Sequence, residues 1–349
     1  MRFHVDNDID GVINGWLCPN NPQAISKVSV SIDGRRVAIV QSNGTVAALR
    51  EWGWHATGEC AFILDEVQVP GITQAERVEV YDVDSNLLIY RRRSKPDLKQ
   101  GRVILMNPSI DPVVSLQNAL FAHYQMSYFS VERLPEETLT NIINGGMMKS
   151  LLIAGTIPLV RYEGYLQSNE YSTCILVADA YLELARRILW LRKRASLLAL
   201  PAQAWQAYAI RSPIAFAESL PLEDLGGLRK AFRNVDQETW NFLSSPLTRA
   251  MACNLPDERL ESFHPSQALE ALSRFQVVGH EAFFDAYATT VFTKLGIEAA
   301  PPPPPGPAPE AERLADVLRR TPTARTLIDY DVMLGDAVHD VVAQQWTGV

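Results

Sequence analysis

TCILVADAYLELARRILWLRKRASLLAL (173–200) joins a short apolar run to a long amphipathic pattern. TCILVADA (173–180) is rich in consecutive apolar residues, which is typical of a strand that is buried on both faces of a sheet. YLELARRILWLRKRASLLAL (181–200) has the spacing of a strong helix. Because a buried strand leading into a helix is half of a β-α-β unit, the stretch predicts an α/β domain whose parallel sheet is covered by helices on both faces.

The same alternation of strand and helix extends to both sides of this stretch. VILM (103–106) predicts a short buried strand, SLQNALFAHYQMSYF (115–129) has helical spacing, and ETLTNIINGGMMKSLLIAG (137–155) predicts a helix and then a strand. Further helical patterns follow. Seven prolines in AAPPPPPGPAP (299–309) exclude a helix and predict an extended exposed loop, after which TLIDYDVMLGDAVHDVVAQQW (326–346) predicts a final helix.

The N-terminal quarter of the chain has the pattern of an all-β domain. KVSVSI (27–32) and RRVAIV (35–40) alternate polar and apolar residues on either side of Asp33-Gly34, which predicts a hairpin. Later short strands are CAFILDEVQV (60–69), RVEVYDV (77–83) and LLIYRR (87–92). Short strands at regular spacing favour a β-sandwich.

The predicted organisation is therefore a β-sandwich accessory module over residues 1–93, a basic linker over 94–102 and an α/β domain over 103–349. The basic run RRRSKPDLKQGR (91–102) marks the boundary. We expect it to be solvated, as most charge runs are. The alternative is that it forms a basic edge for an acidic ligand.

Composition excludes several classes of protein. The chain has 349 residues, of which 47% are apolar and 21% are charged, so it can bury the cores of two domains. A net charge of −8 argues against a nucleic-acid partner. No apolar run reaches the length of a transmembrane segment, and MRFHVDNDIDG (1–11) lacks the apolar core of a signal peptide. We therefore expect a cytoplasmic protein.

The four cysteines predict neither a disulfide framework nor a metal motif. They are scattered and include no C-x-x-C pair, so free buried thiols are expected. The cysteines are Cys18, Cys60, Cys174 and Cys253.

Several segments in order carry a family resemblance. RVILMNPSIDPVVSLQNALFAHY (102–124) and ILVADAYLELARRILWLRKR (175–194) each join a strand to a helix. SSPLTRAMAC (244–253), ALEALSRFQVVGHEAFFDAYATTVFTKLGI (268–297) and LIDYDVMLGDAVH (327–339) follow them. Together they resemble a bacterial or carbohydrate-type sulfotransferase domain. The resemblance implies a P-loop-like parallel sheet and the sulfuryl donor PAPS.

The resemblance also shows what the first donor loop has lost. Such enzymes hold the 5′-phosphosulfate with backbone N–H groups of a loop rich in lysine and glycine. Here the lysine position is Ser109, and the glycine positions are Asp111 and Pro112, of which the proline has no N–H to donate. Ser115 retains the hydroxyl that is expected near the start of the helix.

The second donor segment, which holds the 3′-phosphate in the family, has changed as well. The first arginine is Ala178, Asp179 is retained, and the next arginine is Glu183. Arg186 is the residue that could substitute, although a solvated basic helix face is the simpler interpretation of it. Losing three charge-assisted hydrogen bonds costs on the order of 5 kcal/mol, so we do not expect a standard PAPS site.

The opening segment GVINGWLCPNNPQAISKVSVSIDGRRVA (11–38) resembles an accessory β-sandwich of bacterial glycan-modifying enzymes. With that resemblance, Trp16 and Trp54, together with Trp52, predict a platform on which sugar rings could stack. The competing interpretation is that these tryptophans fill the core of the sandwich or its rim.

Candidate catalytic residues have no diagnostic motif around them. Sulfuryl transfer needs a base for the acceptor hydroxyl, and His123 is the candidate that lies nearest to the first loop. Lys149 and Arg161 could contact the substrate or the donor. The sequence contains no Ser-His-Asp arrangement and no Walker loop.

Three functions remain open at this point. The first is a pseudoenzyme of a bacterial surface-polysaccharide pathway that binds a glycan or a glycan-modifying enzyme without standard PAPS chemistry. The second is an active PAPS-dependent sulfotransferase whose donor site uses Arg186, Lys149 or Arg161, with His123 as base and a carbohydrate hydroxyl as acceptor. The third is a structural module for assembly.

Overall fold

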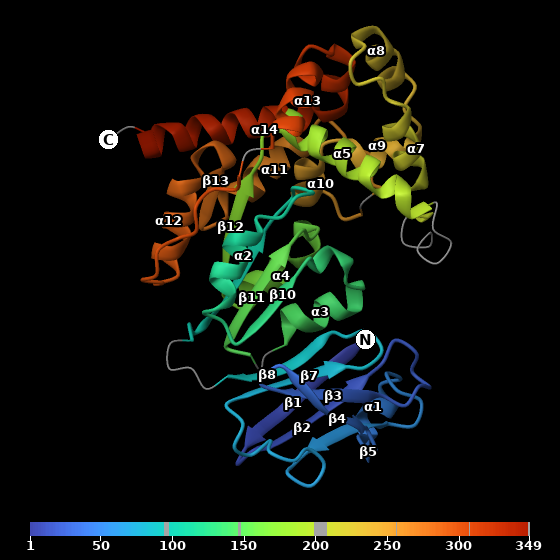
Figure 1. The fold of residues 1–349 in the computed structure, drawn as a ribbon, viewed down its shortest axis with the longest axis vertical. Coiled ribbons are helices and arrows are strands. Elements are labelled where there is room, and N and C mark those ends of the chain that lie inside the picture. The colour runs from blue at the N-terminus through green and yellow to red at the C-terminus, as the bar shows by residue number, and fades with distance from the viewer. Residues whose placement is uncertain (94–97, 146–147, 199–207, 256, 307, 348–349) are drawn as a thin grey trace. The chain divides into compact units, whose positions relative to one another are not determined.

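The computed structural model describes residues 1–93, 98–145, 148–198, 208–255, 257–306 and 308–347 (Figure 1). By contacts between Cα atoms the chain divides into two compact units. The N-terminal unit contains Met1–Val103, Leu120–Ile153 and Gly164–Tyr171. The C-terminal unit contains Ile104–Ala119, Ala154–Glu163 and Ser172–Val349.

Two four-stranded sheets form the first part of the N-terminal unit (Figure 1). The first sheet has the order β1 (Arg2–Ile9), β2 (Val12–Cys18), β6 (Glu59–Leu64), β5 (Gly44–Thr45). The second has the order β4 (Arg35–Gln41), β3 (Lys27–Ile32), β7 (Arg77–Asp82), β8 (Leu88–Arg93). The pairs within them are antiparallel, and a short helix, α1 (Ala47–Glu51), follows β5.

Both sheets contribute to one apolar core. Ile13 of β2 and Phe62 of β6 are buried in the same cluster as Val30 of β3 and Val80 of β7. The predicted hairpin is confirmed, since β3 and β4 pair across Asp33 and Gly34, which have φ of 50° and 80°. Left-handed conformation at both central residues suits the twist of a two-residue hairpin. The sequence therefore predicted the antiparallel β module correctly.

The expectation of a solvated basic run is wrong for its first three residues. Arg91 is 5% exposed in β8, where its Nε donates to Glu79 Oε1 at 2.8 Å. The Nε of Arg92 donates to Asp8 Oδ2 at 2.7 Å, and Arg93 donates to backbone carbonyls. Arg91 and Arg92 are neutralised by acids on other strands, which the charge pattern along the sequence does not show. Residues 94–97 of the predicted linker lie outside the described residues.

A five-stranded parallel sheet follows (Figure 1), and this confirms the predicted α/β architecture. Its order is β10 (Met126–Phe129), β11 (Ser150–Gly155), β9 (Gly101–Met106), β12 (Tyr171–Val177), β13 (Val277–His280). The intervening helices are α2 (Val114–Phe121), η1 (Val131–Arg133), α3 (Glu136–Asn144), α4 (Leu159–Ser168) and α5 (Ala180–Leu198).

The prediction of one helix over 115–129 is only half right. The helix ends at Phe121, and Met126–Phe129 is strand β10. Met126 and Tyr128 are buried, as the side chains of a sheet strand are. Aromatic residues favour strands, and here that preference and the burial outweigh the apparent helical spacing.

Helices make up most of the C-terminal unit. The helices described after α5 are, in chain order, α7 (Arg211–Ser219), α8 (Leu225–Arg233), α9 (Gln237–Leu243), α10 (Pro246–Ala252), α11 (His264–Ser273), η2 (Glu281–Phe283), α12 (Phe284–Lys294), α13 (Pro309–Arg319) and α14 (Pro322–Thr347). Leu184 and Ile188 of α5 belong to the same buried cluster as Leu314 and Leu318 of α13. Residues 299–306 are neither helix nor strand.

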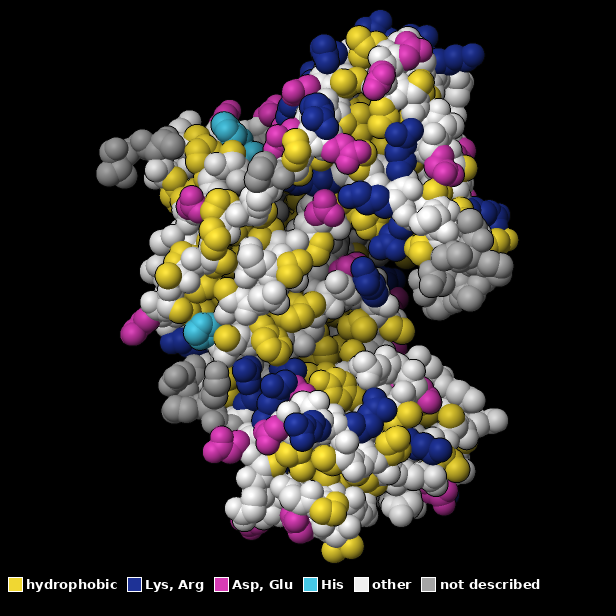
Figure 2. Space-filling model, viewed as in Figure 1, with side chains coloured by type: hydrophobic (Ala, Val, Ile, Leu, Met, Phe, Trp, Pro, Cys, Tyr) yellow, Lys and Arg dark blue, Asp and Glu magenta, His cyan; other side chains and the backbone are white. Residues whose placement is uncertain are grey.

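The surface mixes both signs of charge. On the face in Figure 2, Lys and Arg side chains over α7 and α8 lie among Asp and Glu side chains rather than in one basic stripe. Of the helices in the described parts of the chain, none combines the length and the hydropathy that crossing a bilayer requires.

Candidate functional site

A pocket of about 560 Å³ opens in the C-terminal unit at the carboxyl ends of β9, β12 and β13. The strand order places β9 beside β12, and the chain continues from these two strands toward opposite edges of the sheet. Loops diverge at such a point and leave a crevice, which is the usual ligand site of open α/β sheets. The lining residues come from within 107–113, 176–186, 280–284 and 304–312, and from His339.

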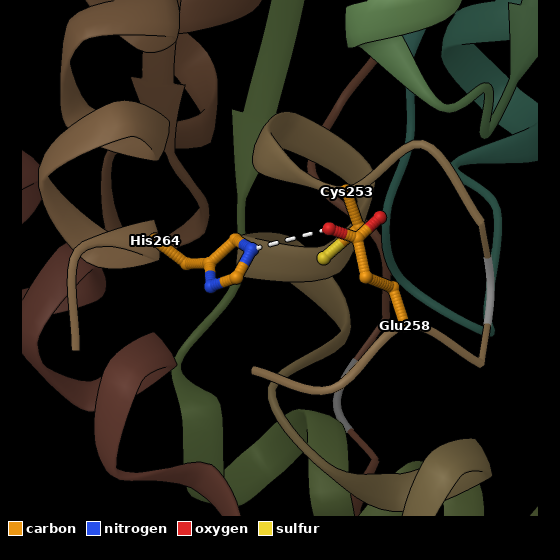
Figure 3. A group of neighbouring side chains, drawn as sticks. All are labelled: Cys253, Glu258 and His264. Carbon is orange, nitrogen blue, oxygen red and sulfur yellow. Dashed lines mark ion pairs between the residues drawn. The ribbon is translucent and has the colours of Figure 1, made fainter. Parts of the chain in front are cut away.

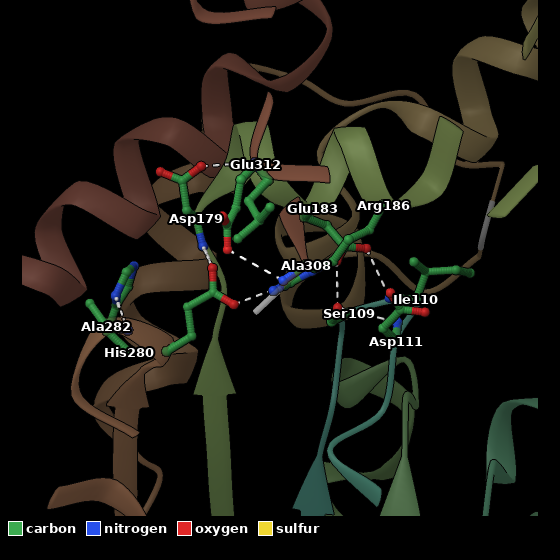
Figure 4. Close-up of polar contacts among 12 residues, drawn as sticks. Ser109, Ile110, Asp111, Asp179, Glu183, Arg186, His280, Ala282, Ala308 and Glu312 are labelled. Carbon is green, nitrogen blue, oxygen red and sulfur yellow. Dashed lines mark hydrogen bonds and ion pairs between the residues drawn. The ribbon is translucent and has the colours of Figure 1, made fainter. Parts of the chain in front are cut away.

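The carboxylate of Glu183 lies against the loop that follows β9 (Figure 4). Ser109 Oγ donates a hydrogen bond to Glu183 Oε2 at 2.5 Å, and the backbone N–H of Ile110 donates to Oε1 at 2.9 Å. Arg187 donates from Nε to the same Oε1 at 2.6 Å. The Glu183 side chain is 8% exposed and that of Arg187 is 12% exposed. A hydroxyl, a backbone N–H and a guanidinium are the donors that a phosphate would use, and here they hold a carboxylate of the chain itself.

A second carboxylate, that of Glu281, lies at the start of α5, where Figure 4 labels Asp179 and Arg186. The backbone N–H of Asp179 donates to Glu281 Oε1 at 2.9 Å, and Arg186 Nη1 donates to Oε2 at 2.8 Å. The helix start and the arginine that the resemblance would place at a 3′-phosphate are thus paired internally. The Arg186 side chain is 18% exposed, so it is not part of a solvated helix face.

Asp179 itself has a structural role in this arrangement. Its Oδ1 accepts a hydrogen bond from the N–H of Leu182 at 2.8 Å and lies 2.9 Å from Arg319 Nη2. A side chain that accepts from the third residue of a helix is an N-cap. The retained aspartate therefore stabilises the first turn of α5.

Charge in the pocket opposes an anionic ligand. Asp111, Asp179, Glu281 and Glu312 line it, and among the described lining residues the guanidinium of Arg186 is the only Lys or Arg group. His280 adds little positive charge at neutral pH, because burial lowers the pKa of its imidazole. A pocket with this balance of charges repels phosphates.

The other predicted residues do not join this site. Ser115 is exposed on α2, and Arg161 is in the first turn of α4. His123 lies in the turn after α2, and Lys149 immediately precedes β11, so both belong to the N-terminal unit. None of the four is among the described residues that line the pocket.

The N-terminal unit has a groove of about 710 Å³ beside its tryptophans. The rings of Trp16 and Trp54 line the groove with centroids 6.1 Å apart, and Trp52, 62% exposed, packs 5.0 Å from Trp54. The guanidinium of Arg2 lies 4.0 Å from the Trp54 ring. Trp16 and Trp54 also pack against the small buried cluster of Cys18, Leu49 and Cys60. Each of the two thus supports the core and lines an open groove.

Comparison with known proteins adds no identification. No family model matches the chain, and neither a curated protein nor a solved structure matches it. The site must therefore be interpreted from its own geometry.

The roles of two carboxylates, those of Glu183 and Glu281, were not recognised from the sequence. Glu183 was interpreted only as the loss of an arginine, although its spacing of four residues from Arg187 was a signal for an ion pair on one helix face. Glu281 had no such signal, because its partner Asp179 lies 102 residues away in the chain.

Proposed function

We propose that this chain is a sulfotransferase-like protein of a bacterial surface-polysaccharide pathway that recognises a glycan and does not transfer a sulfuryl group from PAPS. One observation carries the proposal. The resemblance places the phosphates of PAPS at two positions, and at each of them the hydrogen-bond donors are already bonded to a carboxylate of the chain, that of Glu183 or that of Glu281.

Competition between these carboxylates and a nucleotide favours the internal arrangement. A phosphate of PAPS would have to displace Glu183 from three hydrogen-bond donors and Glu281 from two. Each charge-assisted hydrogen bond contributes about 1.5–3 kcal/mol, so bonds gained by the nucleotide are offset by bonds lost within the protein. The displaced carboxylates would also remain near the incoming dianion, which repels them.

Calorimetry with PAP, the product that PAPS leaves after sulfuryl transfer, tests whether the chain binds this nucleotide. We expect no saturable heat at PAP concentrations up to about 1 mM, which corresponds to a binding free energy weaker than about −4 kcal/mol. Dissociation in the micromolar range would contradict this proposal and favour the active sulfotransferase.

The groove in the N-terminal unit supports the glycan part of the proposal. Aromatic faces with polar groups around them suit sugar rings, which present apolar C–H faces and hydroxyl edges. Trp16 and Trp54 provide the aromatic faces, and Thr140 and Asn144 on α3 line the same groove.

Replacing Trp54 by alanine tests that groove. We expect binding to an array of bacterial surface-polysaccharide oligosaccharides to weaken about tenfold, because aromatic contacts contribute roughly 0.5–1.5 kcal/mol beyond the area they bury. Trp346→Ala, on α14 in the other unit, is the matched control and should bind like the wild type. If no oligosaccharide binds, or if Trp54→Ala binds as well as the control, the groove is not the recognition site.

A further inference from the structure

Three side chains with metal-binding atoms meet in the C-terminal unit, away from the pocket at the strand ends (Figure 3). Cys253 caps the end of α10, Glu258 is in the connecting segment, and His264 is the first residue of α11. One ligand atom of each lies within 4.8 Å of the others. Cys253 is 1% exposed and His264 is 2% exposed, whereas the Glu258 side chain is 35% exposed. Two of the three ligand side chains are therefore shielded from solvent, and the third is partly accessible.

The separation of the nitrogen and oxygen atoms suits two ligands of one ion. His264 Nε2 and Glu258 Oε1 are 3.5 Å apart, which is longer than the 2.7–3.2 Å of a good N–H···O hydrogen bond. Zinc bonds of about 2.0–2.2 Å in a tetrahedron place two such ligands roughly 3.4 Å apart. The spacing of this pair fits a common ion, and the cysteine sulfur lies within 4.8 Å of a ligand atom of each of the other two residues.

Neighbouring backbone groups hold the ligands in place. Glu258 Oε2 accepts a hydrogen bond from the N–H of Asn254 at 2.9 Å, and this orients Oε1 toward the histidine. The backbone N–H of Glu261 donates to His264 Nδ1 at 2.7 Å, and the carbonyl oxygen of the same residue lies 3.2 Å from Nδ1. An ion on Nε2 requires the tautomer with its proton on Nδ1, so on binding the Glu261 N–H has to turn away and its carbonyl oxygen has to accept from Nδ1, the usual outer contact of a metal-bound histidine.

A carboxylate and a guanidinium, those of Glu258 and Arg249, both lie near the Cys253 thiol. The guanidinium of Arg249 is held in place by neutral groups, since its Nη1 donates to the backbone oxygen of Glu258 at 2.7 Å and its Nη2 to Ser244 Oγ at 2.8 Å. A divalent ion would supply the charge that stabilises a thiolate in this position.

We propose that Cys253, Glu258 and His264 bind one zinc ion, with water in the fourth position. A thiolate, an imidazole and a carboxylate form a donor set that suits zinc better than magnesium or calcium, which prefer oxygen alone. On binding, the thiol releases its proton to solvent and the sulfur–zinc bond forms without oxidation or reduction. The ion would fasten the segment between α10 and α11. This site is independent of the proposed glycan recognition.

Metal titration of the full-length, tag-free chain after chelator treatment tests this site. We expect one zinc ion per chain, and with cobalt(II) in its place a thiolate-to-metal charge-transfer band in the near ultraviolet. Cys253→Ser should abolish that band. Glu258→Gln, at a partly exposed position, should weaken zinc binding by at least the roughly 10–100-fold that loss of an outer contact costs.

Cys174→Ser is the matched control, because Cys174 is a buried thiol in β12 outside the cluster. It should bind zinc and cobalt like the wild type. The proposal is overturned if the wild type binds no stoichiometric zinc, if its cobalt spectrum lacks the thiolate band, or if folded Glu258→Gln binds zinc with unchanged affinity. Circular dichroism confirms that each variant is folded.

Discussion

Glu183→Ala will lower the free energy of unfolding by about 3–5 kcal/mol, because removing one partner of a buried ion pair leaves the other charge uncompensated. The guanidinium of Arg187 would lose its ion-pair partner, and Ser109 Oγ and the N–H of Ile110 would lose their acceptor. Denaturant unfolding at neutral pH measures this loss. Glu183→Gln keeps an oxygen acceptor but not the charge, so its free energy of unfolding should lie between those of the wild type and Glu183→Ala.

The same variant should gain a response to anions. The vacated position keeps a hydroxyl, a backbone N–H and a guanidinium, so sulfate or phosphate can bind where the carboxylate was. An anion present at about ten times its dissociation constant stabilises the folded state by roughly 1.4 kcal/mol. Because sulfate stabilises most proteins by exclusion from their surface, the measured quantity is the difference in melting-temperature rise between variant and wild type.

Glu270→Ala is the control for this experiment. Glu270 forms an ion pair with Arg274 four residues along the helix, but its side chain is 75% exposed. Exposed pairs contribute about 0–1 kcal/mol, so this variant should remain close to the wild type and respond to sulfate as the wild type does. A Glu183→Ala protein with wild-type stability, or with the same sulfate response as the control, would show that Glu183 does not occupy an anion position.

Asp331→Ala should have a similarly large effect for a different reason. Asp331 is 5% exposed in α14, and its carboxylate accepts hydrogen bonds from Leu247 N at 2.8 Å and from Thr248 N and Oγ1 at 2.8 and 2.7 Å. These donors belong to the first turn of α10. Unsatisfied buried donors cost about 1–3 kcal/mol each, so we expect a loss of about 3–5 kcal/mol at pH 7.

The effect of Asp331→Ala should also depend on pH. Burial raises the pKa of Asp331 from 3.8 to about 6. Between these values the folded chain holds a proton that the unfolded chain has released, so the contribution of this group to stability falls as the pH rises from about 4 to 6. The stability difference between wild type and Asp331→Ala should therefore be larger at pH 4 than at pH 7, by about 1.4 kcal/mol per unit of pKa shift.

Asp329→Ala provides the comparison on the same helix. Asp329 pairs with Arg325 at 3.1 Å, and both side chains are about half exposed. Its removal should change the free energy of unfolding by less than about 1 kcal/mol. Equal unfolding midpoints for the two alanine variants, or a pH dependence of the opposite sign, would contradict the role assigned to Asp331.

Local patterns predicted the elements where one preference dominated. The Asp33-Gly34 turn and the alternating strands around it were predictable, because hairpin geometry depends on two residues and their neighbours. The run 115–129 was not, because helical spacing and aromatic strand preference compete within it. Arg91 and Arg92 were misjudged for another reason, since their acidic partners are on other strands.

The sequence by itself determined the antiparallel β module and the parallel α/β sheet. These properties depend on the period of apolar residues and on the identity of residues at a few positions. Only the tertiary structure decided that Glu183 accepts from Ser109 and Glu281 from the N–H of Asp179, and that Cys253, Glu258 and His264 lie together. The physical reason is that hydrogen bonds and ion pairs act over a few ångströms of space, whereas Glu183 and Ser109 are separated by 74 residues of chain.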